Sequence, residues 1–300
     1  MRALQSVLML GFLMAPVMAL AKPAASPPAA ALSPDQLKLA SSDDLSIGNR
    51  EFDQDGTGPL QWLVPDAPAK TELTSGWLTV RARDPMAGWY SDGSGPFLYL
   101  PISGDFVVET RVTASKQEAA DQVPVGKFSS TGLLIRDPAS ANEKMRWVMY
   151  NIGFQDKFFG TEAKTTRDFD GKFHFHNMGG FRSLSTLYLT KRDASSPEAY
   201  LRMCRVGPEI RMYFRRGADG SWTEEAQDAT TQVQGNGASN PTPGVTANGP
   251  VRFLRPDLPP LVQVGLIANR GGSSDAKADG ESRFDFVKFK RVSTFDDCTA

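Results

Sequence analysis

The sequence predicts an all-β protein, a sandwich of two antiparallel sheets, and three observations support this fold class. Many short segments alternate apolar and polar residues, as in 106–113 (FVVETRVT) and 146–152 (RWVMYNI), and a period of two is typical of half-buried strands. Glycine, proline, asparagine and aspartate separate these segments, which places turns between neighbouring strands. No ten-residue window carries the apolar stripe of an amphipathic helix. Short strands at this spacing indicate a sandwich or a barrel.

The first 21 residues are predicted to be a cleavable signal peptide. Arg2 supplies a positive start, residues 7–20 are almost wholly apolar, and Ala19 and Ala21 place small side chains at a cleavage site. The apolar run is shorter than the about 20 residues that a membrane span needs, and a retained anchor is the alternative. Cleavage predicts a secreted or periplasmic protein that has no membrane association afterwards.

The remaining chain is predicted to divide into a tether, one domain and a tail. Residues 22–46 begin with an Ala/Pro-rich run, KPAASPPAAALSP, which has no apolar period and predicts a flexible tether. Residues 47–295 are long enough for a single large β sandwich, so no second domain is required. Residues 296–300 are left as a C-terminal tail.

The predicted strands follow one another through both halves of this domain. They are residues 76–82, 106–113, 132–136, 146–152, 185–190, 199–206, 209–215, 262–268 and 282–292. A short helical turn is expected at 115–121, and residues 154–181 interrupt the strand pattern. Residues 227–260, rich in Asn, Gly, Thr and Pro, predict a long surface loop that buries too little apolar area to offset the cost of ordering.

Charge and cysteine content restrict the partners and the compartment. The formal net charge is −1, which provides no electrostatic footprint for nucleic acid or anionic lipid and fits a neutral ligand better. Cys204 and Cys298 are the two cysteines, and an oxidising compartment favours a disulfide between them. Such a bond would tie the tail to a central strand, and the alternative is two unpaired thiols.

Six sets of residues carry a family resemblance, in order along the chain. They are Arg50-Glu51-Phe52-Asp53 with Trp62, 104–110 (GDFVVET), 131–136 (TGLLIR) with Trp147 and Val148, 201–203 with 219–222 (LRM, DGSW), 264–268 (VGLIA) and 283–286 (RFDF). Together they resemble the concanavalin A-like lectin/glucanase superfamily, in particular its bacterial regulation-of-enolase-like branch, over residues 47–292. The resemblance implies a jelly-roll sandwich of two antiparallel sheets. It implies no single reaction, because this fold hosts lectins, lyases, hydrolases and inert modules.

The paired carboxylates of the superfamily's glycanases are missing from the sequence. A retaining mechanism needs two carboxyl groups about 5–5.5 Å apart, which residues i and i+2 of one strand can provide. Glu224 and Glu225 are adjacent, Asp168 and Asp170 precede a glycine in a predicted turn, and Glu109 stands alone. A conventional retaining glucanase is therefore not expected, no catalytic residue is assigned, and whether the protein is an enzyme stays open.

The only two histidines stand close together in 168–177 (DFDGKFHFHN). In a strand, His174 and His176 would share one face, where two imidazoles can bind a metal or a sugar hydroxyl or act as a base. Zinc would need a third ligand, and the nearest candidates are Asp168, Asp170 and Asn177. The alternative is a solvated edge strand whose phenylalanines cover the core.

Arg136, Trp147, Tyr150 and Arg202 join the two histidines as candidate carbohydrate-binding residues. Flat aromatic rings stack on the C–H faces of sugars, while arginine binds hydroxyl groups. Arg136 and Arg202 each lie within an apolar strand, where a covered arginine needs a partner and a cleft-facing one does not. The alternative is a strand-edge charge that deters pairing with another sheet.

The resemblance also implies a structural Ca²⁺, which is common in the superfamily and takes several oxygen ligands. Glu51 and Asp53 near the start of the domain and Asp285 near its end are the candidate ligands, if the terminal strands pair. No other cofactor is expected.

Three functions follow as hypotheses. The first is an exported protein that binds a neutral glycan on its concave sheet. The second is an enzyme that acts on glycans or glycosides, a hydrolase or lyase with His174 or His176 as its base. The third is a structural or protein-interaction module without a small ligand.

Overall fold

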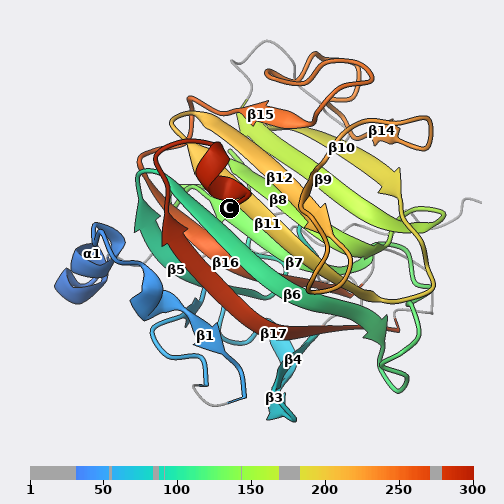
Figure 1. The fold of residues 1–300 in the computed structure, drawn as a ribbon, viewed down its shortest axis with the longest axis horizontal. Helices are drawn as coiled ribbons and strands as arrows, with labels where there is room; N and C mark the ends of the chain where they lie inside the picture. Colours follow the sequence, from blue (N-terminus) through green and yellow to red (C-terminus); the bar gives the residue numbers. More distant parts are fainter. Residues whose placement is uncertain are drawn as a thin grey trace, which may run out of the picture.

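The computed structural model describes residues 32–53, 56–83, 88–90, 92–142, 144–168, 183–270 and 279–300. The predicted signal peptide, the first part of the predicted tether, and His174 and His176 lie outside these described residues. Two antiparallel sheets face each other, so the all-β sandwich is confirmed (Figure 1). Within the described residues, no helix is long and apolar enough to cross a bilayer.

Sheet A, whose central strands lie at the front of Figure 1, has the order β13-β12-β11-β6-β17-β4-β3, with β1 beside β17 and β15 beside β12. Its strands are β1 (Arg50–Glu51), β3 (Pro68–Thr74), β4 (Trp77–Ala82), β6 (Phe106–Lys116), β11 (Glu198–Val206), β12 (Glu209–Arg215), β13 (Thr223–Glu224), β15 (Arg252–Leu254) and β17 (Gly280–Arg291). The antiparallel pairing of β1 with β17 brings the two ends of the domain together.

Sheet B has the order β14-β10-β9-β8-β7-β16-β5-β2. Its strands are β2 (Gln61–Trp62), β5 (Phe97–Ser103), β7 (Ser129–Arg136), β8 (Trp147–Phe154), β9 (Phe159–Asp168), β10 (Ser183–Lys191), β14 (Gln232–Gln234) and β16 (Leu261–Arg270). Every pairing in this sheet is antiparallel.

The core lies between the sheets and takes one side of each strand. In β8, Val148, Tyr150 and Ile152 belong to this core, whereas Trp147 and Met149 belong to a separate apolar cluster on the opposite side of sheet B. We call that side, turned away from sheet A, the outer face of sheet B. Both sides of β8 are buried, so most of its positions are apolar and the alternation expected for residues 146–152 is weak.

All nine predicted strands are present, with ends that differ by a few residues. The predicted helical turn at 115–121 is wrong, because β6 continues to Lys116 and is followed by turns. β5 was not predicted. β9 was also missed, since it occupies the first part of the segment 154–181 that interrupts the strand pattern in the sequence.

Residues 33–46 are folded onto the domain, so the tether prediction is wrong for this part. Ser33 caps α1 (Pro34–Ala40) in a capping box with Gln36, which satisfies the first free N–H groups of the helix. The guanidinium of Arg291 donates to the carbonyl oxygens of Ala40 and Ser42. Leu45, just before the 3₁₀ turn η1 (Ser46–Gly48), lies in the core.

The segment 227–260 is not an unstructured surface loop, which corrects the prediction that it buries little apolar area. Val251 and Phe253 are fully buried, and Leu258 also lies in the core. Phe253 is carried by β15, which pairs with β12 at the margin of sheet A. Two apolar side chains spaced by two residues are enough to anchor the segment, although its composition is that of a loop.

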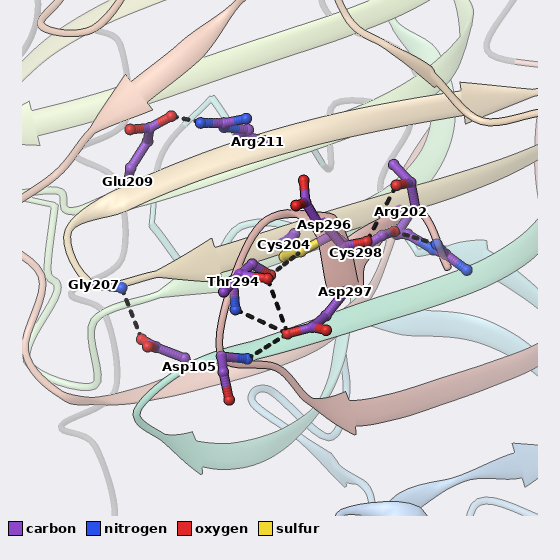
Figure 2. Close-up of a disulfide and its surroundings, with 12 residues drawn as sticks. Asp105, Arg202, Cys204, Gly207, Glu209, Arg211, Thr294, Asp296, Asp297 and Cys298 are labelled. Atoms are coloured by element: carbon purple, nitrogen blue, oxygen red, sulfur yellow. Dashed lines mark hydrogen bonds and ion pairs between the residues drawn. A yellow bond between two sulfur atoms is a disulfide. The ribbon is translucent and has the colours of Figure 1, made fainter.

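The C-terminal tail lies on sheet A, held by the predicted disulfide between Cys204 and Cys298 (Figure 2). Cys204 lies on β11 and Cys298 ends the 3₁₀ turn η2 (Asp296–Cys298), so the bond joins the chain end to a central strand. Arg202 also donates to the carbonyl oxygen of Cys298. Both cysteines are fully buried.

Candidate functional site on the outer face of sheet B

The structure brings together only two of the four predicted carbohydrate-binding residues that it describes. Arg136 on β7 and Trp147 on β8 are directly opposite each other, and both lie on the outer face of sheet B. Tyr150 lies in the core, and Arg202 lies on sheet A. The proposed single surface of these residues is therefore not formed.

Tyr150 is corrected from a ligand contact to a core residue. Its side chain is fully buried, and its hydroxyl donates to Glu225 Oε2 at 2.7 Å. Glu225 also accepts from the Arg192 guanidinium at 2.8 and 2.9 Å. Burial, together with the neighbouring Glu225 carboxylate, holds the pKa of Tyr150 well above its usual value. The network ties β8 to residues outside sheet B and leaves no atom of Tyr150 for a ligand.

Arg202 is likewise engaged within the protein. It donates to Glu109 Oε2 at 2.6 Å and lies 4.1 Å from the centroid of the Trp222 ring. A pocket of about 510 Å³ borders Arg202 and Glu109, but these two residues already pair with each other. Its two terminal nitrogens therefore have partners within the protein, while its Nε is buried without one.

Arg136 is a buried anchor. Its guanidinium makes a bidentate pair with Asp92, at 2.9 and 2.5 Å, and donates to Gln263 Oε1 and Ser140 O, both at 2.6 Å. Asp92 follows Trp89 and Tyr90 by a few residues in the chain. The ion pair between Arg136 and Asp92 thus attaches the chain that follows Trp89 and Tyr90 to β7.

A row of buried polar side chains crosses β8 and β9 on this outer face. Asn151 and Glu162 are cross-strand partners, and Asn151 Nδ2 donates to Glu162 Oε2 at 3.0 Å. Gln155 donates to Asn151 Oδ1 at 3.2 Å and to Gly160 O at 3.0 Å. Lys164 lies two residues beyond Glu162 on the same face. We call Asn151, Gln155, Glu162 and Lys164 the polar row.

Lys164 is a buried cation surrounded by aromatic rings. Its Nζ lies 4.8 Å from the centroid of Trp147 and 5.4 Å from that of Tyr90, and it donates to Trp89 O at 2.8 Å. Burial lowers the pKa of Lys164 to about 8, although the charge of Glu162 opposes this shift. Burial also raises the pKa of Glu162, against the opposing effects of Lys164 and the Asn151 hydrogen bond.

Several polar atoms of this face lack hydrogen-bond partners. Trp147 Nε1 and Gln155 Oε1 are buried without any. Lys164 has one acceptor for its three N–H groups, and within the described chain no residue donates to Glu162 Oε1. Buried polar groups are nearly always satisfied in folded proteins. These atoms and the spare N–H groups of Lys164 lie on one side of β8 and β9, which makes this face the candidate binding site.

Tyr90 covers the polar row from the solvent side. It is 39% exposed while Lys164 beneath it is 4% exposed, and its ring meets Phe128 edge-on at 5.7 Å. Phe128 has a φ of 56°, which is costly for a bulky residue and is often found near functional sites. A Cβ on Gly88 would lie 2.8 Å from the Tyr90 ring, so glycine is what permits this close approach.

The predicted Ca²⁺ ligands are not assembled into a site. Glu51 pairs with Lys288 at 2.6 Å, and Asp285 pairs with Arg111 at 3.0 Å. Among the described residues, no group of three or more His, Cys, Asp and Glu side chains could hold a metal ion. The carboxylates instead neutralise basic side chains on sheet A, and the structure lends no support to the calcium prediction.

Glu162 and Lys164 were missed by the sequence analysis. A signal was present, because Gly160, Glu162, Lys164 and Thr166 occupy alternate positions and include two opposite charges. Two opposite charges on one face of a strand are also the pattern of an ordinary solvent-exposed face, so the sequence alone does not distinguish the two. The candidate residues that were predicted, His174 and His176, lie outside the described part of the chain.

Comparisons with known proteins identify the fold and no family. No protein-family model matches the chain, and no curated protein matches it. One similar structure is a GH43 glycoside hydrolase engineered to display endo-xylanase and exo-arabinofuranosidase activity, with 13% identity and a TM-score of 0.50. The match covers 84% of this chain and 42% of that protein, so this chain spans less than half its length.

Two further structures match over nearly their whole length. The lectin UEA-II, solved with galactose, is 12% identical over 83% of this chain and 99% of its own, with a TM-score of 0.45. A functionally unknown protein from Saccharomyces cerevisiae is 14% identical over 78% and 97%, with a TM-score of 0.46. Fold and site together define an all-β sandwich of two antiparallel sheets with a buried polar row on one outer sheet face.

Proposed function

We propose that this protein is an exported carbohydrate-binding β-sandwich protein that holds a glycan on the outer face of sheet B. The observation that carries this proposal is the polar row, which is buried beside aromatic rings and is incompletely hydrogen-bonded. The order of the sequence segments favours the regulation-of-enolase-like branch of the concanavalin A-like superfamily. The predicted signal peptide and the disulfide both favour a secreted or periplasmic location.

A sugar ring matches the chemistry of this face. Tyr90 provides a partly exposed aromatic ring, while Asn151, Glu162 and Lys164 provide donors and acceptors for hydroxyl groups. Small-molecule sites commonly combine an apolar lining with a few placed polar groups of this kind. The net charge of −1 favours a glycan that is mainly neutral.

A glycan array with the mature protein tests the proposal. The site variant is the double substitution Glu162→Leu with Lys164→Met, which replaces the two charges by apolar side chains of similar volume and preserves folding. The matched control is Glu198→Leu with Arg111→Met, which removes an ion pair of 2.7 Å on sheet A. We expect binding to be lost in the site variant and kept in the control. An array without any binding, or binding that survives in the site variant, would refute the proposal.

A second candidate function is an enzyme that acts on glycosides. It is favoured by one observation: an amine and a carboxyl group, Lys164 and Glu162, are buried two residues apart on the same side of β9. Burial lowers the pKa of Lys164 to about 8 and raises that of Glu162, as is common for groups that transfer protons. Glu162→Gln is then expected to abolish turnover while glycan binding persists. Turnover is measured by mass spectrometry of the products. Binding without products from the unsubstituted protein would exclude this function.

A further inference from the structure

We infer that the sugar held beside Lys164 carries a carboxylate, so that the ligand is a uronic acid residue within a mainly neutral glycan. This inference rests on the proposed function, because it names the kind of sugar that the same face recognises. It starts from a buried ammonium that makes no direct ion pair within the described chain.

Lys164 is a buried cation without a partner carboxylate. Among the buried polar residues of the described chain it is the only lysine, and no described carboxylate lies within ion-pair distance of its Nζ. The charged groups around it are Glu162 on its own strand, which attracts it without a direct ion pair and accepts from Asn151, and the Arg136–Asp92 pair, whose charges already neutralise each other. A buried charge normally needs a partner of opposite sign.

The donors around Lys164 suit a carboxylate. Two N–H groups of the ammonium are unused, and the ring of Trp147, whose Nε1 is buried without a partner, lies 4.8 Å away. Two acceptor oxygens of a carboxylate could take these donors, and charge-assisted hydrogen bonds are about twice as strong as neutral ones. A hydroxyl group offers no negative charge to the ammonium.

The acceptors of the row suit hydroxyl groups of the same glycan. Glu162 Oε1 and Gln155 Oε1 receive no hydrogen bond from the described residues, and sugar hydroxyls can donate to both. The polar row therefore has hydrogen-bond donors at its Lys164 end and acceptors at its Gln155 end. This difference defines the orientation of the bound glycan, whose carboxylate would point toward Lys164. Tyr90, which lies above Lys164 and is partly exposed, would have to turn aside for the sugar to reach this position.

Calorimetric titrations with two matched pairs of sugars test the inference: glucuronate against glucose, and galacturonate against galactose. We expect the acidic sugar to bind at least about tenfold more tightly than its neutral partner. Lys164→Met should remove this preference, while Lys288→Met, which removes an exposed lysine of sheet A, should keep it. Because carboxylate binding would restore the depressed pKa of Lys164, the complex should also take up protons at pH 8, measured in buffers of different ionisation enthalpy.

The outcomes separate the inference from the proposed function. Equal affinity for acidic and neutral sugars, lost in the Glu162→Leu, Lys164→Met variant, would overturn the carboxylate inference and leave glycan binding standing. A preference for uronic acids that survives Lys164→Met would also overturn it. Absence of binding to any sugar or array glycan would overturn both.

Discussion

The ammonium of Lys164 on β9 lies 4.8 Å from the centroid of the Trp147 ring on β8, and both side chains are buried on the outer face of sheet B. A cation on an aromatic face is stabilised by the ring's charge distribution, but this contact does not replace an anion. The contact between Lys164 and Trp147 therefore does not offset the free-energy cost of burying the ammonium.

Replacing Lys164 by methionine should stabilise the protein while it weakens ligand binding. The pKa of Lys164 is about 8 in the folded state, below its ordinary value of 10.5, so between these values the unfolded chain binds more protons. Unfolding free energy should therefore rise with pH above 8 in the unsubstituted protein, and this rise should be missing in Lys164→Met. At pH 7 the relief from burying the ammonium outweighs the lost attraction to Glu162, so the variant should be more stable by about 1 kcal/mol.

Urea unfolding at several pH values between 7 and 9.5 measures both effects. Burial raises the pKa of Tyr150, and that of Tyr90 is raised as well, so their titration is common to both proteins and cancels in the difference. The same pH dependence with and without Lys164 would contradict the expectation.

Removing Arg136 should destabilise the fold more than removing it together with its partner. Arg136→Met leaves the buried Asp92 without its bidentate guanidinium, and breaking such a pair from one side costs about 3–5 kcal/mol. The double variant Arg136→Met, Asp92→Leu should recover part of this loss. Thermal or urea unfolding of the single and double variants provides the coupling energy, and strict additivity of the two single losses would show that the pair is not coupled.

Phe253 should contribute to stability like any core residue, although its segment has the composition of a loop. Phe253→Ala should cost about 3–5 kcal/mol, because the side chain is fully buried. Its neighbour Leu254 is 39% exposed and provides the matched control, where alanine should change the unfolding free energy by about 0.5 kcal/mol or less. Equal effects at the two positions would mean that β15 does not anchor the segment.

The disulfide should stabilise the fold without affecting the polar row. Its two cysteines are 94 residues apart, for which the loop-entropy model sets an upper value of about 4–5 kcal/mol. Cys204→Ala with Cys298→Ala should lower the unfolding free energy by up to that amount and leave sugar affinity unchanged, since the bond lies on sheet A. A loss of sugar affinity in the folded double variant would contradict this expectation, because it would mean that the disulfide on sheet A affects binding on sheet B.

Local patterns in the sequence were sufficient for most of the fold. Alternation in residues 146–152 predicted β8, but it could not tell which side faces the core, so Tyr150 and Trp147 were assigned to one surface and lie on opposite ones. β9 was missed because its core side carries Thr161, Ala163 and Thr165 and its outer side is also polar. Such a strand has no apolar period to detect.

The contacts that make the site depend on residues far apart in the chain. Lys164 reaches the carbonyl oxygen of Trp89, 75 residues away, and Arg136 reaches Asp92, 44 residues away. No local pattern predicts such pairs. The disulfide was predicted because the sequence has only two cysteines and a predicted export signal, so the choice was between one pairing and none.

Calorimetric titration with a glycan selected from the array tests the central claim, that ligands bind on the outer face of sheet B, most directly. We expect the unsubstituted protein and the Glu198→Leu, Arg111→Met control to bind with equal affinity, and the Glu162→Leu, Lys164→Met variant to lose at least about tenfold. Equal affinity in all three proteins, or an equal loss in both variants, would contradict the assignment of the site to the polar row.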